Sequence, residues 1–281
     1  MGKQGEFKFA FLDGFWLKLL AFIFMTVDHL GVFLQMYGLA PEAASACRFI
    51  GRLAFPLFIF LLAEGMRLSH HRGKYILRVF LMYAIITIPE TFILYFPPLA
   101  NSIGISPTTL DGHPFIDILF VGLVLYCLTL KGWKKLLALL PAAFIFLSFY
   151  YSVYDPFTPY FPMYLRSGYG LFGLLLGLGY FGINKYLDFY QMNGRLLRNL
   201  LSIGALFLAF ITFYVFALTL PQYAVFGSDW AKWETPCVIA ALFLLFYNGK
   251  RGYDAAWWRV FSYSYYLIHM AVLFVVFMFI G

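Results

Sequence analysis

The chain has 281 residues, of which 63% are hydrophobic and only 12% are charged, and its mean hydropathy is +0.81. This balance excludes a soluble globular protein, which carries about 25% charged residues. The formal net charge is +7, but the basic residues are scattered over short segments and form no continuous stripe. We therefore predict an integral membrane protein and no nucleic-acid binding.

Nine apolar segments follow one another along the chain, and most could cross a hydrocarbon core about 30 Å thick. They fall at residues 15–36, 48–68, 75–97, 115–130, 133–152, 167–181, 200–219, 235–248 and 260–280. Because unpaired backbone groups cannot face lipid, such spans must be helices. We expect an all-α fold, a polytopic bundle of about nine transmembrane helices that forms a single domain over residues 1–281.

The positions of the basic residues predict the orientation of this bundle. With a cytoplasmic N-terminus, sixteen of the twenty Lys and Arg residues fall on cytoplasmic segments. Only Arg48, Arg52, Arg166 and Lys232 would lie outside. This bias is typical of multi-pass proteins. We expect a protein of the cell membrane, here a bacterial cytoplasmic membrane, surrounded by lipid, and the sequence leaves its oligomeric state open.

Five ionisable residues lie close together in the first two apolar segments. They are Asp28, His29, Arg48, Arg52 and Glu64. A charged side chain at the centre of a membrane helix costs about 2.5–3.5 kcal/mol on insertion scales, so each must face a partner or a wet cavity. Each is therefore a candidate functional residue.

Asp28 and His29 lie at the depth that Arg48 and Arg52 reach in the second span, so the four side chains could converge. Histidine has a pKa near neutrality, which suits a general base or a transient acyl acceptor. Adjacent helical residues point about 100° apart, so we expect Asp28 to bind elsewhere, for instance to Arg52. Alternatively, Asp28 and an arginine form a purely structural ion pair, and His29 is structural too.

The second segment carries polar groups through most of the membrane, because Arg52 and Glu64 would be about 18 Å apart along one helix. We expect Pro56, which lies between them, to kink that helix. His269 could act in the site or be a packing histidine bonded to a neighbouring hydroxyl. The wider polar network that we predict comprises Glu64, Glu90, Asp117, Tyr169 and His269.

Other kinds of catalytic site find little support. A metal site could be assembled from His29, Glu90, Asp117 and His269, but no two of these have a recognised ligand spacing. The three cysteines contain no C-x-x-C pair, and the chain has no G-x-S-x-G elbow. We therefore expect no metal and take His29 as the reactive side chain.

Several blocks of sequence resemble the TraX family in content, order and spacing. They lie at residues 18–31, 48–58, 63–65, 75–78, 169–173, 247–252 and 266–269. The resemblance covers most of the chain and places it within the broader transmembrane acyltransferases. Two positions differ from the family pattern: Asp117 stands where Asn is common, and Tyr266-Leu267-Ile268 replaces the usual Tyr-Pro before the last-span histidine.

The resemblance implies N-acetylation, because the member that gives the family its name acetylates the amino terminus of a conjugative pilin, with acetyl-CoA as donor. His29 would carry the acetyl group or only a proton, while Arg48 and Arg52 would orient His29 or stabilise an oxyanion. The acceptor would be a peptide amine or a glycan hydroxyl. A basic cytoplasmic rim could bind the CoA phosphates, and it comprises Arg67, His70, His71, Arg72, Lys74, Tyr75 and Arg78.

Two further classes of protein are compatible with the same residues. A membrane transporter or proton-coupled channel could use the polar line as its path, although the sequence shows no clear inverted repeats. A membrane scaffold would leave the charges within the spans unexplained. We take acyl transfer as the leading hypothesis and transport as its alternative.

Overall fold

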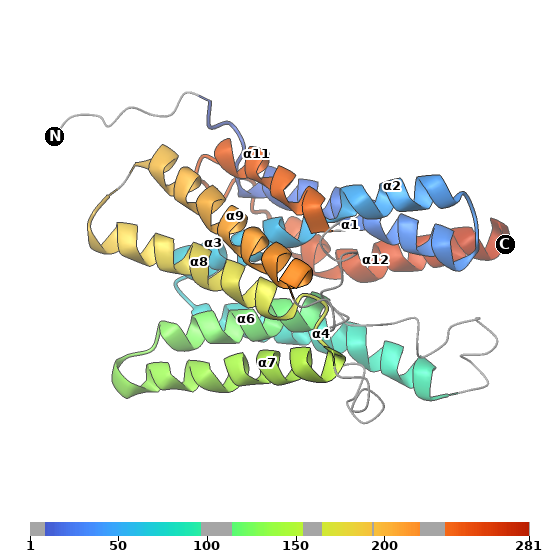
Figure 1. The fold of residues 1–281 in the computed structure, drawn as a ribbon, viewed down its shortest axis with the longest axis horizontal. Coiled ribbons are helices and arrows are strands. Elements are labelled where there is room, and N and C mark those ends of the chain that lie inside the picture. Colours follow the sequence, from blue (N-terminus) through green and yellow to red (C-terminus); the bar gives the residue numbers. More distant parts are fainter. Residues whose placement is uncertain (1–8, 97–113, 154–164, 193, 220–233, 281) are drawn as a thin grey trace. The chain divides into compact units, whose positions relative to one another are not determined.

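The computed structural model describes residues 9–96, 114–153, 165–192, 194–219 and 234–280, and its regular elements there are helices (Figure 1). The expected all-α fold is confirmed for these residues. The α-helices and the two 3₁₀-helices, marked η, are α1 (Gly14–Met36), α2 (Pro41–Gly51), α3 (Ala54–Leu68), α4 (Arg72–Tyr95), α6 (Pro114–Leu128), η2 (Gly132–Ala138), α7 (Leu139–Val153), α8 (Gly170–Phe189), α9 (Arg195–Thr219), η6 (Thr235–Ile239), α11 (Ala240–Leu245) and α12 (Ala256–Ile280).

Four helical stretches among the described residues are long and apolar enough to cross a membrane. They are Gly14–Met36, Pro41–Leu68, Arg195–Val215 and Ala256–Ile280. By length and composition the chain is thus a multi-pass membrane protein. The total of about nine spans and the cytoplasmic N-terminus stay predictions.

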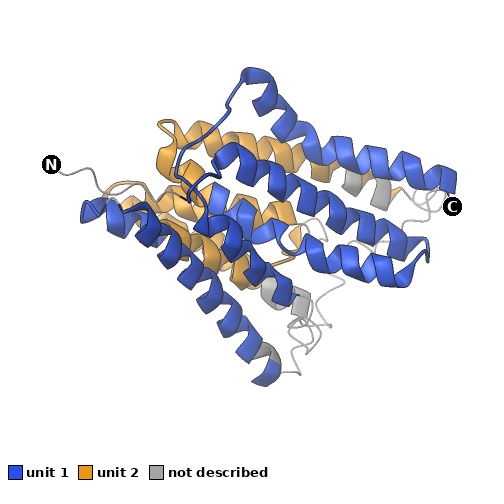
Figure 2. Cartoon of the chain, turned by 90° about the horizontal axis from the view of Figure 1, so that it is seen from above, with its two compact units in different colours: residues 1–61, 182–221, 226–281 blue, residues 62–181, 222–225 orange. Residues whose placement is uncertain are grey.

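The chain divides into two compact units, which Figure 2 colours separately. Unit 1 comprises residues 1–61, 182–221 and 226–281, and unit 2 comprises residues 62–181 and 222–225. Where the structure describes the chain, the divisions between the units fall within α3 and α8. A single domain over residues 1–281 stays a prediction.

In unit 1, α1 and α2 form a helical hairpin whose ends follow from local chemistry. The Asp13 side chain caps α1 by accepting hydrogen bonds from two first-turn amides, at 3.0 and 3.1 Å. Gly38, with φ +64°, takes the left-handed conformation that ends the helix. Pro41 then starts α2, where a missing amide costs nothing.

The second predicted span is broken into α2 and α3 at Arg52 and Leu53. We expected the interruption of this span at Pro56, and it lies at Arg52 and Leu53 instead. Pro56 lies in the first turn of α3, where no backbone amide needs an intrahelical acceptor. Arg52 therefore lies at the join, and it does not share one continuous helix with Glu64.

Helix α1 packs against both α2 and α12, while α11 packs against α9. The start of α1 is also tied to the segment that connects α11 to α12. The amide of Leu12 donates to Phe246 O at 3.0 Å, and the amide of Asn248 donates to Leu12 O at 2.7 Å. Two residues further on, the amide of Gly14 donates to Lys250 O at 2.8 Å.

In unit 2, α6 packs against α4, α7 and η2. Gly122 of α6 permits the approach to α4, because a Cβ at this position would lie 2.9 Å from Ile76 Cδ1. On another side of α6, the rings of Phe120 and Phe144 stack with their centroids 4.1 Å apart, which joins α6 to α7. Helix α6 is thus the central helix of this unit.

Candidate functional site

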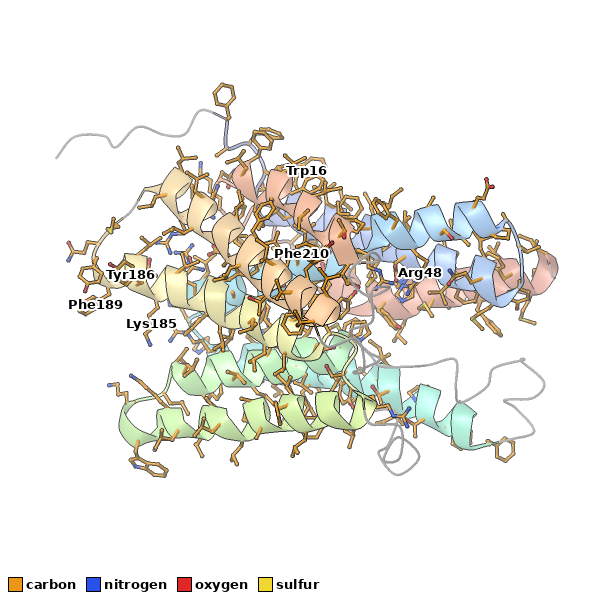
Figure 3. The ribbon with its side chains drawn as sticks, in the orientation of Figure 1. Trp16, Arg48, Lys185, Tyr186, Phe189 and Phe210 are labelled. Carbon is orange, nitrogen blue, oxygen red and sulfur yellow. The ribbon has the colours of Figure 1, made fainter. Side chains whose placement is uncertain are left out.

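Helix α1 directs two neighbouring polar side chains toward different helices. The Asp28 carboxylate pairs with Arg48 of α2, which Figure 3 labels, at 2.5 Å, and with Arg52 at 3.5 Å. His29 faces α12, where its Nδ1 lies 3.0 Å from His269 Nε2. The expected pairing of Asp28 with Arg52 is present. The four side chains expected to converge instead make contacts on two sides of α1, because adjacent helical residues diverge by about 100°.

A second carboxylate extends the ion pair. Arg52 Nη1 donates to Glu234 Oε1 at 2.9 Å, so charges of alternating sign run from Arg48 through Asp28 and Arg52 to Glu234. The side chains of Arg52 and Glu234 are 13% and 5% exposed. Desolvation of such a pair is costly, and removing one partner leaves an uncompensated charge. The four groups together carry no net charge.

Sequence reasoning missed Glu234. This residue directly precedes the apolar segment 235–248, and a charge in that position looks like the ordinary polar end of a loop. Its position at the end of an apolar span could have identified it as a site residue, because a carboxylate that is buried among the helices requires a partner. The partner, Arg52, is 182 residues away in sequence, and no periodicity connects the two.

Two glycines let α1 and α2 approach closely around Asp28. A Cβ on Gly51 would lie 2.6 Å from Asp28 Cα, and a Cβ on Gly31 would lie 2.8 Å from Ala44 O. Both contacts involve backbone atoms, which cannot turn aside as the end of a flexible side chain can. Gly51 therefore determines where the Asp28 carboxylate meets the arginines.

Aromatic rings surround the histidine pair. His269 is buried, and its Nδ1 lies 2.9 Å from Tyr265 O. The Tyr265 ring stacks on His269 at 5.2 Å between centroids, and the Tyr266 ring packs edge-on against both imidazoles. The Tyr265 hydroxyl also lies 2.8 Å from Thr26 Oγ1 of α1. His269 therefore bonds a carbonyl and His29, and not the neighbouring hydroxyl that we had considered.

These partners assign the protons of the two neutral imidazoles. A carbonyl oxygen only accepts, so His269 Nδ1 must donate to Tyr265 O, and His269 Nε2 is then an acceptor. His29 Nδ1 must therefore donate to His269 Nε2. The lone pair of neutral His29 is on Nε2, as a general base or a nucleophile at that atom requires.

In unit 2, Asp117 is fully buried and binds the start of α8. Its Oδ2 accepts from the amides of Gly168 at 2.9 Å and Tyr169 at 3.0 Å. Its Oδ1 accepts from the amide of Gly170 at 3.0 Å and from the Ser167 hydroxyl. The carboxylate thus caps a helix from a different helix. Tyr169 takes part in this contact through its backbone amide.

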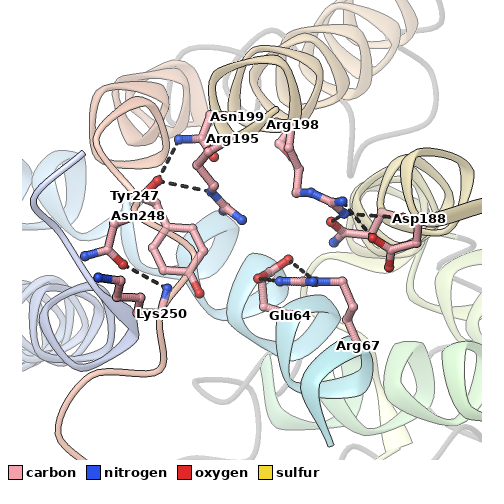
Figure 4. Close-up of polar contacts among 11 residues, drawn as sticks. Glu64, Arg67, Asp188, Arg195, Arg198, Asn199, Tyr247, Asn248 and Lys250 are labelled. Atoms are coloured by element: carbon pink, nitrogen blue, oxygen red, sulfur yellow. Dashed lines mark hydrogen bonds and ion pairs between the residues drawn. The ribbon is translucent and has the colours of Figure 1, made fainter. Parts of the chain in front are cut away.

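The other predicted polar residues of unit 2 lie around the end of α3. Arg67 donates to both carboxylate oxygens of Glu64, at 3.1 and 2.9 Å (Figure 4). Arg72 Nε donates to a backbone carbonyl of α3 at 2.8 Å, while Tyr75 lies against Gly65. Two arginines of the predicted rim thus also stabilise local structure. The exposed members of the rim are His70, His71, Arg72, Lys74 and Arg78.

Glu90 belongs to α4, but its side chain falls outside the described part of the structure. Within the described residues, no three His, Cys, Asp or Glu side chains are placed to hold a metal ion. The ion pairs around Asp28 and the contact between the two histidines form the candidate site, and all of its residues belong to unit 1. It consists of His29, His269, Asp28, Arg48, Arg52 and Glu234.

Comparison with known proteins gives one match. Neither the curated proteins nor the solved structures contain a match to the chain. The family model described as TraX protein matches residues 14–277, a range that includes all six residues of the candidate site. The sequence blocks that resemble this family also lie within the matched range. The chain therefore belongs to the TraX protein family.

Proposed function

We propose that this protein is a membrane-embedded acyltransferase that moves an acetyl group from acetyl-CoA to a peptide amine, such as a pilin amino terminus, or to a glycan hydroxyl. The observation that carries the proposal is the hydrogen bond from His29 Nδ1 to His269 Nε2. It orients one imidazole and leaves the lone pair of that ring on Nε2. Membership of the TraX protein family supports the same chemistry.

His29 acts as the general base in this mechanism. Acetyl-CoA supplies a thioester whose C–S bond is replaced by a C–N or C–O bond to the acceptor. His29 Nε2 takes one proton from the attacking amine or hydroxyl and returns it to the departing sulfur. The proton on His29 Nδ1 stays hydrogen-bonded to His269 Nε2, which prevents the ring from turning. Proton transfer by a positioned side chain contributes about 10²–10⁴-fold to a rate.

A covalent route uses the same residue. His29 Nε2 can attack the acetyl carbon and expel the CoA thiolate, which leaves a cationic acetyl-imidazole. The amine or hydroxyl then takes the acetyl group, and the proton that it loses balances the thiolate, so that neutral His29 is restored. In both routes negative charge develops on the acetyl oxygen. Arg48 and Arg52 supply positive charge beside α1 for its stabilisation. Asp28 and Glu234 hold the two guanidiniums in position.

Acetyl transfer by purified protein tests the proposal. The protein is reconstituted in lipid with acetyl-CoA labelled on the acetyl group, and CoA release and label transfer to peptide amines and glycan hydroxyls are measured. The His29→Ala variant should lose about 100-fold or more of the turnover. Val272→Ala, on an exposed position of α12, is the matched control and should keep the parent rate.

Two results would count against the proposal. Absence of acetyl-CoA-dependent turnover with every acceptor would remove acyl transfer, and a folded His29→Ala variant with the parent rate would remove His29 from the mechanism. The transport alternative makes the opposite prediction. It requires solute or proton flux through protein-containing liposomes without acetyl-CoA.

A further inference from the structure

Residues 247–252, with the sequence YNGKRG, connect α11 to α12 and are called the YNGKRG loop below. This loop presents two cationic side chains to solvent. Lys250 is exposed, and the Arg251 side chain is 60% exposed. Neither residue takes part in the chemistry proposed above. The two exposed charges of the loop therefore need another explanation.

Helix α9 holds the first part of the loop in place (Figure 4). Asn199 Nδ2 donates to Leu245 O at 2.9 Å and to Tyr247 O at 2.8 Å. Arg195 Nε donates to Tyr247 O at 3.2 Å, and its guanidinium lies 4.3 Å from the centroid of the Tyr247 ring. Asn199 and Tyr247 are both fully buried. Buried polar contacts on this scale keep a loop in one conformation.

Two glycines allow the loop to adopt this shape. Gly249 and Gly252 have φ values of +80° and +73°, which strain any residue with a side chain. A Cβ on Gly249 would lie 2.8 Å from Arg195 Nη1, and a Cβ on Gly252 would collide with the Asp13 carboxylate. The loop therefore carries its charges on a framework that other residues could not form without rearrangement.

The charge around the loop is predominantly positive. Asp254 pairs with Arg251 at 2.9 Å and lies 3.7 Å from Arg259, so one carboxylate offsets two arginines. Lys250 and Arg195 add two further positive charges. Guanidinium and ammonium groups of this kind bind phosphates through charge-assisted hydrogen bonds. The loop is thus suited to a ligand with several anionic groups.

The loop also lies at a defined distance from the histidine pair along the helices α1 and α12. The Gly14 amide bonds Lys250 O, and residues 14 and 29 of α1 are separated by about 22 Å along the helix. Residues 256 and 269 of α12 are separated by about 20 Å. Two packed helices therefore give nearly the same distance between the loop and the imidazoles.

We propose that the YNGKRG loop binds the phosphate groups of the acyl donor. A CoA thioester fits this arrangement, because its phosphates and its reactive carbon lie at opposite ends of an extended arm. The arm would run along α1 and α12 toward His29. This inference rests on the proposed acetyl transfer and assigns the donor's phosphates to the unit that holds the histidines, instead of the rim of unit 2.

Equilibrium binding of CoA to the full-length protein tests the assignment without any need for turnover. The Lys250→Gln/Arg251→Gln variant should bind CoA about 100-fold more weakly, because it loses two charge-assisted contacts. Its affinity for pantetheine, which has no phosphate, should stay that of the parent. The matched control is Lys134→Gln/Lys135→Gln, which removes the same charge from exposed positions of η2. Unchanged thermal denaturation midpoints show that both variants are folded.

The outcomes separate this inference from the proposed function. Parent-like CoA affinity in the loop variant would overturn the inference, and a loss of affinity in Lys74→Gln/Arg78→Gln would then place the phosphates on the rim. Weakened CoA binding in the loop variant, combined with no acetyl transfer by the parent, would support the loop and reject the enzyme. A parent that binds no CoA would reject both.

Discussion

Asp28 and Asp117 both lie within apolar helices, yet their negative charges are stabilised in different ways. Asp117 accepts hydrogen bonds from three backbone amides and one hydroxyl at the start of α8. Asp28 pairs with the guanidiniums of Arg48 and Arg52, and Arg52 also binds Glu234. Backbone amides at a helix end stay in place, whereas the ends of long side chains can exchange partners during a reaction.

A charge inside a membrane helix is therefore an ambiguous sign of function. An insertion cost of about 2.5–3.5 kcal/mol applies to a charge at the centre of a span, and the partner of the charge decides what the charge does. The donors around Asp117 are those of a helix cap. Those around Asp28 belong to a cluster beside His29, the histidine that we propose as the base. Removing Asp117 should thus change stability, and removing Asp28 should change activity.

The largest effect is expected for Asp117→Ala. The substitution leaves the amides of Gly168 and Tyr169 without their acceptor, while the Gly170 amide keeps Ser167 Oγ. Each unsatisfied donor costs about 1–3 kcal/mol, so we expect a loss of at least about 2 kcal/mol. Unfolding of the purified protein in mixed micelles measures this loss, with Glu42→Ala on the exposed side of α2 as control. Parent-like stability combined with lost acetyl transfer would instead make Asp117 a functional residue.

Asp28→Asn should have its main effect on turnover. It weakens the hydrogen bonds that hold Arg48 and Arg52, and a hydrogen bond to a charged group is worth about 1.5–3 kcal/mol. If that energy is needed in the transition state, acetyl transfer per folded molecule falls about 10–100-fold. Labelled acetyl transfer, corrected for the folded fraction, gives the value. An unchanged rate would reduce the Asp28 cluster to a structural ion pair.

The helices were predictable where apolar runs end in residues with clear local preferences. The expected span 15–36 begins one residue after the observed start of α1 and ends at the same residue. The Asp13 cap precedes α1, and Gly38 follows it. The pairing of Asp28 with an arginine was predictable too, because the two residues lie on consecutive helices. In both cases the deciding interactions lie within one helix or between two consecutive helices.

Contacts between distant segments were not predictable in the same way. Glu234 and Arg52, or His269 and His29, are brought together only by the packing of the whole unit, and no spacing in the sequence reports that packing. The break at Arg52 was missed for a different reason. Proline fits both a kink and a first helical turn, and only the observed start of α3 distinguishes them.

A smaller effect tests whether the position of Asp28 depends on close helix packing. Gly51→Ala forces a methyl group against the backbone of Asp28 and should cost about 1–3 kcal/mol, the range for overpacking. Gly204→Ala is the matched control, because a Cβ on this residue of α9 meets nothing within 4 Å. The control should stabilise the helix by about 0.5–1 kcal/mol. Equal effects of the two substitutions would contradict the packing argument.

The smallest effect is expected for Asp117→Asn, and it separates the charge of Asp117 from its shape. The amide oxygen can accept from the amides of Gly168 and Tyr169, while the NH₂ group donates to the Ser167 hydroxyl. The Gly170 amide keeps its bond of 2.6 Å to Ser167 Oγ. Because the three backbone amides retain acceptors, and only the hydroxyl proton of the half-buried Ser167 must turn to a new one, the stability should change by less than about 1 kcal/mol.

This result would also show that an asparagine can serve the same cap as the aspartate of this chain. A loss of stability close to that of Asp117→Ala would show that the negative charge itself is required at the start of α8. Asp117 would then resemble Asp28, because both sites would depend on a charge. The two substitutions at position 117, measured side by side, therefore decide whether the contrast between the two aspartates is one of charge or only of hydrogen-bond geometry.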